Sequence, residues 1–237
     1  DFLEDRSTIR VIHLATKQCR TVLDGKFEYS YSDGDQWYQW SPDSRWILSN
    51  YIGIGGWNNK DVALINASGN GEIHNLTQSG YNDSGAKWVL DGKAMIWESD
   101  RAGYRSHGSW GAHGDIYIMF FDLEAYERFL MTKEELALVE EEEKKDDKKE
   151  SDQKEEKADK DIVMELEGIQ DRIVRLTPNS STLGYAIIDK KGENLYYTAA
   201  FEDAYDLWKI NLRSKDISLE SKATGAAHME MDSEGKY

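Results

Sequence analysis

The sequence contains few of the residues that mark several classes of protein. Its 237 residues include one cysteine, Cys19, and two prolines. A single cysteine excludes an internal disulfide framework and paired CxxC metal sites, and so few prolines exclude collagen-like and proline-rich chains. No apolar stretch approaches the ~20 residues that a membrane-spanning helix needs. We therefore expect no insertion into a membrane.

Positive charge is also scarce. The chain has 29 Lys and Arg against 45 Asp and Glu, which gives a net charge of −16. A field of this sign repels phosphate backbones and anionic lipid, so nucleic acid and membrane surfaces are poor partners. Aromatic residues, by contrast, are abundant, with 8 Trp and 13 Tyr. Such a composition is typical of a folded chain rather than a disordered one.

One pattern recurs along the chain: a large apolar residue, two spacers, a polar turn pair and a second apolar run. It occurs at 40–49, 88–97 and 188–197, and incompletely at 231–237. The turn pairs are Asp43-Ser44, Asp91-Gly92, Lys191-Gly192 and Glu234-Gly235. Because Asp and Gly tolerate the positive φ of hairpin turns, each occurrence predicts two short strands joined by a tight turn.

A second pattern alternates with the first. It consists of β-branched and aromatic runs of strand length. These runs lie at 9–14, 61–66, 115–121 and 206–212. A further short strand is expected after them, at 19–23, 73–77, 172–177 and 217–219. The strand at 172–177 comes late, which predicts an insertion between the third and fourth strands of that repeat.

Four strands in each unit of roughly 40–50 residues is the period of a β-propeller blade. We therefore predict an all-β fold, a β-propeller fragment of four-stranded antiparallel blades. The full blades are expected at about 37–77, 86–177 and 185–221, with a partial blade at each end. As domains, the blades occupy 1–122 and continue at 169–237, on either side of an insertion at 123–168. Because one blade cannot bury both its faces, nearly all the tryptophans are expected between neighbouring blades.

The insertion has two parts. The apolar spacing of 123–139 fits an amphipathic helix or a helix-turn-helix. Residues 140–161 then contain 12 acidic residues and 7 lysines among 22 positions. Such a run is expected to be a disordered, solvated tether, or a solvated helix with Glu–Lys pairs. A charged lid or docking arm is the alternative.

Several segments resemble a known family. Trp40 to Ile47 resembles the W-S-P-D-G-[KR] repeat of TolB proteins, prolyl oligopeptidases and tricorn-type peptidases. Two further features narrow the resemblance to the tricorn-type peptidases. They are the segment from Ser99 to Gly103 and the Lys/Glu-rich insertion after Asp122. Residues 166–177 are similar to the L-D-G-I-x-D-R-x-x-R-L segment of bacterial tricorn-like serine peptidases, with Glu167 at the usual Asp. Over essentially its whole length, the chain resembles the N-terminal WD40-like propeller portion of a tricorn protease homologue.

The resemblance implies a piece of a large serine peptidase, a hydrolase whose propeller channels or filters peptides toward a catalytic region outside this chain. The implied partners are peptide or polypeptide substrates and the remaining domains of the parent chain; self-association into a homo-oligomer is left open. The resemblance implies a cytoplasmic location, with a periplasmic or exported one as the alternative. A TolB-like protein-binding module and a propeller of a prolyl-oligopeptidase-like enzyme are the alternative functions.

The glycine-rich loops 50–60 and 101–114 carry the candidate contact residues. Aromatic side chains on such loops suit peptide binding, because propellers bind ligands with the loops at the ends of their blades. The candidates are Tyr51, Trp57, Tyr104, Arg105, His107, Trp110 and, with them, His113. Packing of each loop on a neighbouring blade is the alternative interpretation.

The same loop contains the sequence's nearest approach to catalytic chemistry. Ser109 could act as a nucleophile with His107 or His113 as its base, but His107 stands where a G-x-S-x-G elbow has its first glycine. The two histidines could also ligate a metal. A glycine-rich connection between strands explains the segment without chemistry, so we assign no catalytic residue, no cofactor and no metal.

Overall fold

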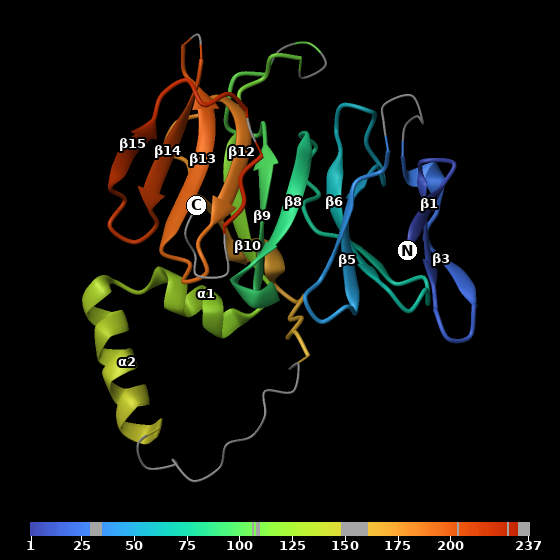
Figure 1. Cartoon of the computed structure of the whole chain (residues 1–237), viewed down its shortest axis with the longest axis horizontal. Coiled ribbons are helices and arrows are strands. Elements are labelled where there is room, and N and C mark those ends of the chain that lie inside the picture. The colour runs from blue at the N-terminus through green and yellow to red at the C-terminus, as the bar shows by residue number, and fades with distance from the viewer. Residues whose placement is uncertain are drawn as a thin grey trace.

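The computed structural model describes residues 1–28, 35–105, 107, 110–147, 161–202, 204–226 and 228–231. In these residues the chain forms four antiparallel sheets, which follow one another in sequence and stand side by side in Figure 1. The first sheet contains β1 (Phe2–Glu4), β2 (Thr8–Ile12) and β3 (Cys19–Leu23). The second contains β4 (Tyr38–Trp40), β5 (Trp46–Tyr51), β6 (Asp61–Asn66) and β7 (Ile73–Asn75).

The third and fourth sheets are also four-stranded. The third contains β8 (Asp83–Val89), β9 (Ala94–Ser99), β10 (Asp115–Phe120) and β11 (Ile173–Arg175). The fourth contains β12 (Thr182–Ile188), β13 (Asn194–Ala200), β14 (Tyr205–Asn211) and β15 (Ile217–Ser221). Three complete four-stranded sheets therefore lie where the sequence predicts three full blades, and the all-β, propeller-like fold class is confirmed.

Each sheet is a simple meander, because strands that are consecutive in sequence are neighbours in the sheet. The predicted turn pairs join the first and second strands of the complete sheets. Ser44 (φ 59°), Asp91 (φ 53°) and Gly192 (φ 70°) have the positive φ that such tight turns use. The repeated turn pairs thus set where each hairpin reverses.

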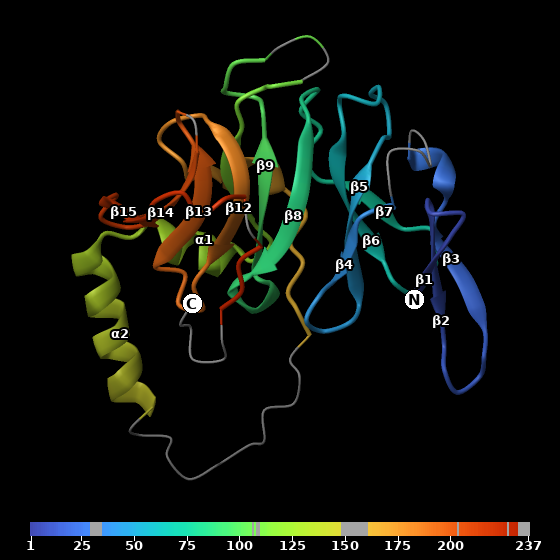
Figure 2. The same cartoon turned by 45° about the horizontal axis from the view of Figure 1, so that its top comes forward.

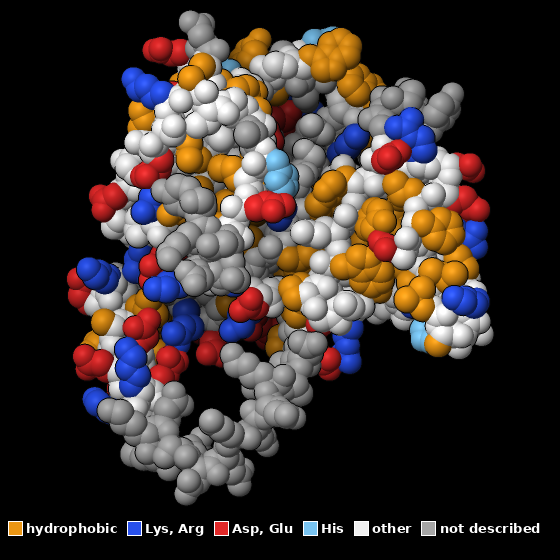
Figure 3. Space-filling model, viewed as in Figure 1, with side chains coloured by type: hydrophobic (Ala, Val, Ile, Leu, Met, Phe, Trp, Pro, Cys, Tyr) orange, Lys and Arg blue, Asp and Glu red, His pale blue; other side chains and the backbone are white. Residues whose placement is uncertain are grey.

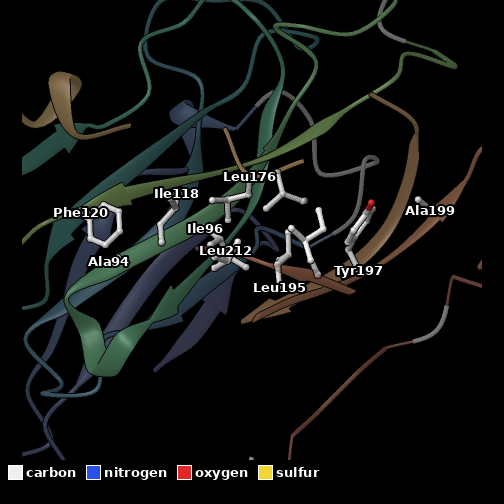
Figure 4. Packing of buried hydrophobic residues seen from close by; sticks show 12 residues of the cluster. Ala94, Ile96, Ile118, Phe120, Leu176, Leu195, Tyr197, Ala199 and Leu212 are labelled. Carbon is white, nitrogen blue, oxygen red and sulfur yellow. The ribbon is translucent and has the colours of Figure 1, made fainter. Parts of the chain in front are cut away.

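Every gap between neighbouring sheets is filled by its own hydrophobic core. One cluster, with Ile9 and Ile47, joins the first sheet to the second, and another, with Leu64 and Trp97, joins the second to the third. A further cluster joins the third sheet to the fourth. Figure 4 shows Ile96, Ile118 and Phe120 of the third sheet facing Leu195 and Tyr197 of the fourth.

Most of the tryptophans lie in these cores or pack against them. Six of the eight belong to the clusters or pack on them: Trp37, Trp40, Trp46, Trp88, Trp97 and Trp208. The other two, Trp57 and Trp110, belong to none of the described clusters. The expectation that nearly all the tryptophans lie between sheets holds for these six, and the two exceptions are both in the loops that the sequence analysis selected.

The insertion follows β10 and contains two helices, α1 (Leu123–Leu130) and α2 (Lys133–Asp147). Asp122 caps the N-terminus of α1, because its carboxylate accepts the Ala125 N–H at 2.9 Å. Thr132 and Glu135 form a capping box before α2, in which the Thr132 N–H donates to the Glu135 carboxylate at 2.8 Å. Of the two expectations for 123–139, the helix-turn-helix is the one observed. For 140–161 the sequence offered a disordered tether or a solvated helix with Glu–Lys pairs, and residues 140–147 are helical, with Lys144 Nζ 3.9 Å from the Glu140 carboxylate. Residues 148–160 are outside the described part of the chain.

One strand of the N-terminal repeat was not predicted, and most of the C-terminal repeat is outside the described residues. Strand β1 pairs with β2 and makes the first sheet three-stranded, although the sequence patterns did not indicate it. The last repeat, at 231–237, is outside the described residues except for Met231. Among the helices that the structure describes, none combines the length and apolar character needed to cross a bilayer.

Candidate functional site

The connections β5–β6, β7–β8 and β9–β10 leave their sheets at one end, which we call the loop end. Figure 2 shows the β9–β10 connection at this end and the two helices at the other. Arg105 ties the three connections together. Its Nη2 donates to Asn59 Oδ1 at 2.6 Å, its Nε lies 3.2 Å from an Asp100 carboxylate oxygen, and its guanidinium lies over the Tyr81 ring at 5.3 Å. Arg105 therefore holds the loop end together.

Trp57 and Trp110 lie side by side on this end. Their ring centroids are 5.7 Å apart at an interplanar angle of 48°. Trp57 is 39% exposed and Trp110 is 72% exposed. The structure thus brings together two candidates that are 53 positions apart in sequence, and it leaves their rings open to solvent. Figure 3 shows hydrophobic side chains gathered at the loop end, along the top of that view.

Tyr104 and His113 form a second aromatic contact in the β9–β10 connection. Their rings meet edge to face at 6.0 Å, and the His113 N–H donates to the Tyr104 carbonyl at 2.8 Å. Tyr104 is 66% exposed. His107 is exposed, and its carbonyl accepts the Trp110 N–H at 3.4 Å. These contacts join described residues on either side of Trp110 within the β9–β10 connection.

Tyr51 occupies a different setting from the other candidates. It lies at the end of β5, packs on the core between the first and second sheets, and meets the Phe27 ring at 4.9 Å. Burial, with the nearby Asp61 carboxylate, raises the pKa of its phenol. Its half-buried position against Phe27 is the packing role that the sequence offered as the alternative for each loop residue.

The catalytic hypothesis finds no support from the residues that the structure describes. Ser109 is outside them, so its position relative to His107 and His113 is not described. Within the described part of the chain, no three His, Cys, Asp or Glu side chains are grouped as a metal site would need. Among the described residues, the loop end exposes the aromatic rings of Trp57, Tyr104 and Trp110.

Buried acids below the loop end fasten strands to one another. The Thr177 hydroxyl donates to Asp115 at 2.7 Å and accepts the Ile116 N–H at 3.2 Å. The second sheet repeats the arrangement, in which the Thr77 hydroxyl donates to Asp61 at 3.3 Å. Each clasp joins the third strand of a sheet to a threonine two residues beyond the end of the fourth. An Asp at the start of the third strand, followed by Leu-Thr after the fourth strand, is a sequence signal of this clasp that was not used in the prediction.

Asp83 holds the loop end to the core in a similar way. Arg101 donates to both of its carboxylate oxygens at 3.1 Å, and the Trp97 indole N–H donates at 3.1 Å. Asp83 is fully buried, and charge-assisted bonds of this kind offset the cost of burying a carboxylate. The Ser99–Gly103 segment, singled out by resemblance, thus begins with residues that anchor the β9–β10 connection.

At the opposite end, Arg172 fastens the base of the insertion. Its buried guanidinium donates to the carbonyls of Phe121, Glu165 and Glu167. Phe121 comes just before the insertion and the two glutamates come near its end, so one side chain closes the stem. Arg172, which belongs to the segment 166–177 that carries the family resemblance, therefore has a structural role.

Comparisons with known proteins agree with this architecture. No protein-family model and no curated protein sequence matches the chain. Among solved structures it is similar to TolB from Acinetobacter baumannii, with a TM-score of 0.51 and 15% identity over 90% of this chain and 37% of that one. It is also similar to the tricorn protease, with a TM-score of 0.54 and 10% identity over 92% of this chain and 20% of that one.

A putative dipeptidyl aminopeptidase IV from Bacteroides ovatus matches with a TM-score of 0.46 and 13% identity, over 89% of this chain and 25% of that one. The chain spans less than two fifths of each of these structures. The likeness to TolB and to the tricorn protease supports a propeller-like fold and, at 15% and 10% identity, does not extend to a particular activity.

Proposed function

We propose that this chain is a non-catalytic propeller module that binds polypeptide segments at its loop end. The observation that carries the proposal is the Trp57–Trp110 pair, whose rings are exposed, contact each other at a tilted angle and lie outside the described cores that contain the other tryptophans. Aromatic rings supply large contact areas at small entropic cost, and exposed aromatic groups mark interaction sites. The net charge of −16 favours polypeptides with basic residues.

We further propose that the module belongs to a tricorn-like serine peptidase and passes peptides toward a catalytic region outside this chain. The tricorn-like segment 166–177, the inserted charged run and the structural similarity to the tricorn protease support this assignment. A TolB-like binding module without a peptidase is the second candidate, and the similarity to TolB over 90% of the chain favours it. A cytoplasmic location goes with the first candidate and a periplasmic one with the second.

Binding is tested with a fluorescein-labelled, extended peptide rich in lysine and leucine, followed by anisotropy. Replacing both Trp57 and Trp110 by alanine removes the aromatic platform, and we expect affinity to fall at least about tenfold, or 1.4 kcal/mol. Leu138→Ala is the matched control, because Leu138 is also exposed but lies on α2 at the other end. Equal affinity in the double variant and the parent chain contradicts the proposal.

The absence of catalysis is tested on the same peptide. We expect the chain alone to leave it intact over long incubation. Hydrolysis that disappears in Ser109→Ala would overturn the non-catalytic assignment.

A further inference from the structure

A small cavity lies between the third and fourth sheets, where β12 stands next to β8 and β9 (Figure 1). It has a volume of about 210 Å³, and its apolar wall includes Trp37, Trp97 and Ile116. Sites for drug-sized ligands usually have about 300–1,000 Å³, so this cavity has room for one side chain rather than a whole ligand. Lys87 and Glu98 are its charged groups, and both are only half-buried, which leaves them accessible to solvent.

Two β-bulges shape the cavity. The register of β8 against β9 shifts between Ser84 and Lys87, and the register of β12 against β13 shifts between Leu183 and Ala186. Each bulge contains a glycine that lines the cavity, Gly85 and Gly184. Gly85 has φ +63°, and a Cβ on Gly184 would lie 2.4 Å from the Thr198 hydroxyl. Bulges re-aim side chains and are common beside functional sites, and here they open the two sheets toward Glu98.

The charge pairing around Glu98 is incomplete. Three aspartates in or beside the same sheet each face an arginine: Asp83 with Arg101 (3.1 Å), Asp100 with Arg105 (3.2 Å) and Asp115 with Arg175 (2.8 Å). Among the described residues, the Glu98 carboxylate has no cation or hydrogen-bond donor at such a distance. The cavity is therefore lined by a carboxylate for which the described residues supply no such partner.

Lys87 does not fill this role. Its ammonium donates to the Ala186 carbonyl at 3.0 Å and lies over the Tyr185 ring, 3.0 Å from the centroid. Burial, together with Asp100 and Asp115, raises the pKa of Glu98 to about 7, and burial lowers the pKa of Lys87 to about 8. Both groups are thus poorly stabilised in their charged forms, and a second cation at Glu98 would relieve that carboxylate.

We propose that this cavity binds the cationic end of a lysine or arginine side chain, with Glu98 as the acceptor and the aromatic wall around the aliphatic stem. A carboxylate in a partly desolvated, aromatic setting is the arrangement that favours an ammonium or guanidinium group. The inference deepens the proposed polypeptide binding by assigning a preference for basic residues. It also rests on a site separate from the Trp57–Trp110 pair.

Three small probes separate the sources of the cation. N-acetyl-lysine methylamide has only a side-chain ammonium, norleucine methylamide only an α-ammonium, and N-acetyl-norleucine methylamide neither. Binding is followed through the indole N–H signals of Trp37 and Trp97, assigned with Trp→Phe variants. We expect the lysine probe to shift both signals at millimolar concentration or below, and the neutral probe to bind at least about tenfold more weakly.

Two variants test the role of the carboxylate. Glu98→Gln keeps the size of the side chain, and we expect it to weaken the lysine probe at least about tenfold. Lys87→Met removes the competing positive charge, and we expect it to strengthen the same probe several-fold, an effect that a purely structural role of these residues would not give. Glu202→Gln, an exposed glutamate on the β13–β14 connection, is the control.

The site proposal is overturned if the neutral and lysine probes bind equally, if Glu98→Gln binds the lysine probe as the parent chain does, or if no probe shifts either signal. Tighter binding of norleucine methylamide than of the lysine probe would instead assign the cavity to a peptide N-terminus. The probes need no contact with the loop end. Failure of the peptide to bind there, with the Glu98-dependent shift retained, would therefore contradict the proposed function and leave this site standing.

The pH dependence gives a further test. The titratable or charged groups that face Glu98 are Lys87 from β8, Asp100 after β9, Asp115 from β10 and Tyr185 from β12. Raising the pH from about 6 to 9 ionises Glu98 and discharges Lys87, so we expect the lysine probe to bind more tightly over this range. Binding that stays constant, or that changes equally in Glu98→Gln, contradicts the proposal.

Discussion

The cores between the sheets and the loop end use the same residue type for different purposes. Trp97 is 1% exposed, packs between the second and third sheets, and donates its indole N–H to Asp83. Trp57 and Trp110 are 39% and 72% exposed and contact each other. The tryptophans in the strands are thus fixed by a neighbouring sheet, whereas those in the β5–β6 and β9–β10 connections are exposed to solvent.

The largest effect is expected from removing the strand tryptophan. Trp97→Ala leaves a cavity between two sheets and deprives buried Asp83 of a donor, so we expect a loss of about 3–5 kcal/mol in the free energy of unfolding. Urea denaturation measures this loss. A loss below about 1 kcal/mol would mean that the core between the second and third sheets does not hold them together.

A charge at the boundary between the core and the loop end gives the next effect. The pKa of Glu98 in the folded chain is about 7, above its usual value of 4.5, so the protonated form favours folding. Stability should therefore fall as the pH rises from about 4.5 to 7, and Glu98→Gln should remove this fall. We expect the variant to match the parent chain near pH 4.5 and to exceed it at pH 8 by up to about 3 kcal/mol. A constant difference at every pH would contradict the raised pKa.

The clasp between β10 and Thr177, two residues beyond β11, is expected to contribute less. Thr177→Val leaves the Ile116 N–H without its acceptor and removes a donor from Asp115, at a cost of about 1–2 kcal/mol. Thr177→Ser retains the hydroxyl and serves as the matched control. If Thr177→Val is as stable as the parent chain, the hydrogen bonds of this clasp do not contribute to stability.

The smallest effect completes the comparison. Trp110→Ala removes an exposed ring that belongs to none of the described cores, so we expect a change within about 0.5 kcal/mol. The same denaturation experiment as for Trp97→Ala applies. A loss comparable to that of Trp97→Ala would make Trp110 a structural residue and remove the main support for the loop end as a binding surface.

Much of the fold could be predicted because its turns and strands depend on residues that are close together in sequence. The turn pairs at Asp43-Ser44, Asp91-Gly92 and Lys191-Gly192 and the strand-length runs placed three complete sheets, and the late strand placed the insertion between β10 and β11. Strand β1 was missed because three residues carry too little periodicity. The candidate site was predicted in part: the loops were identified, but the packing role of Tyr51 depends on Phe27, which is distant in sequence.

The repeated four-stranded units could be predicted from the chain alone, because period, turn chemistry and strand composition act over a few residues. The contact of Trp57 with Trp110, the closure of the insertion stem by Arg172 and the place of Glu98 in a cavity without a described partner depend on how the sheets and loops pack. In the sequence, Glu98 is a single charged residue in a mostly apolar strand. Its environment comes from β8, β10 and β12, and contacts between segments so far apart are set by how the sheets pack.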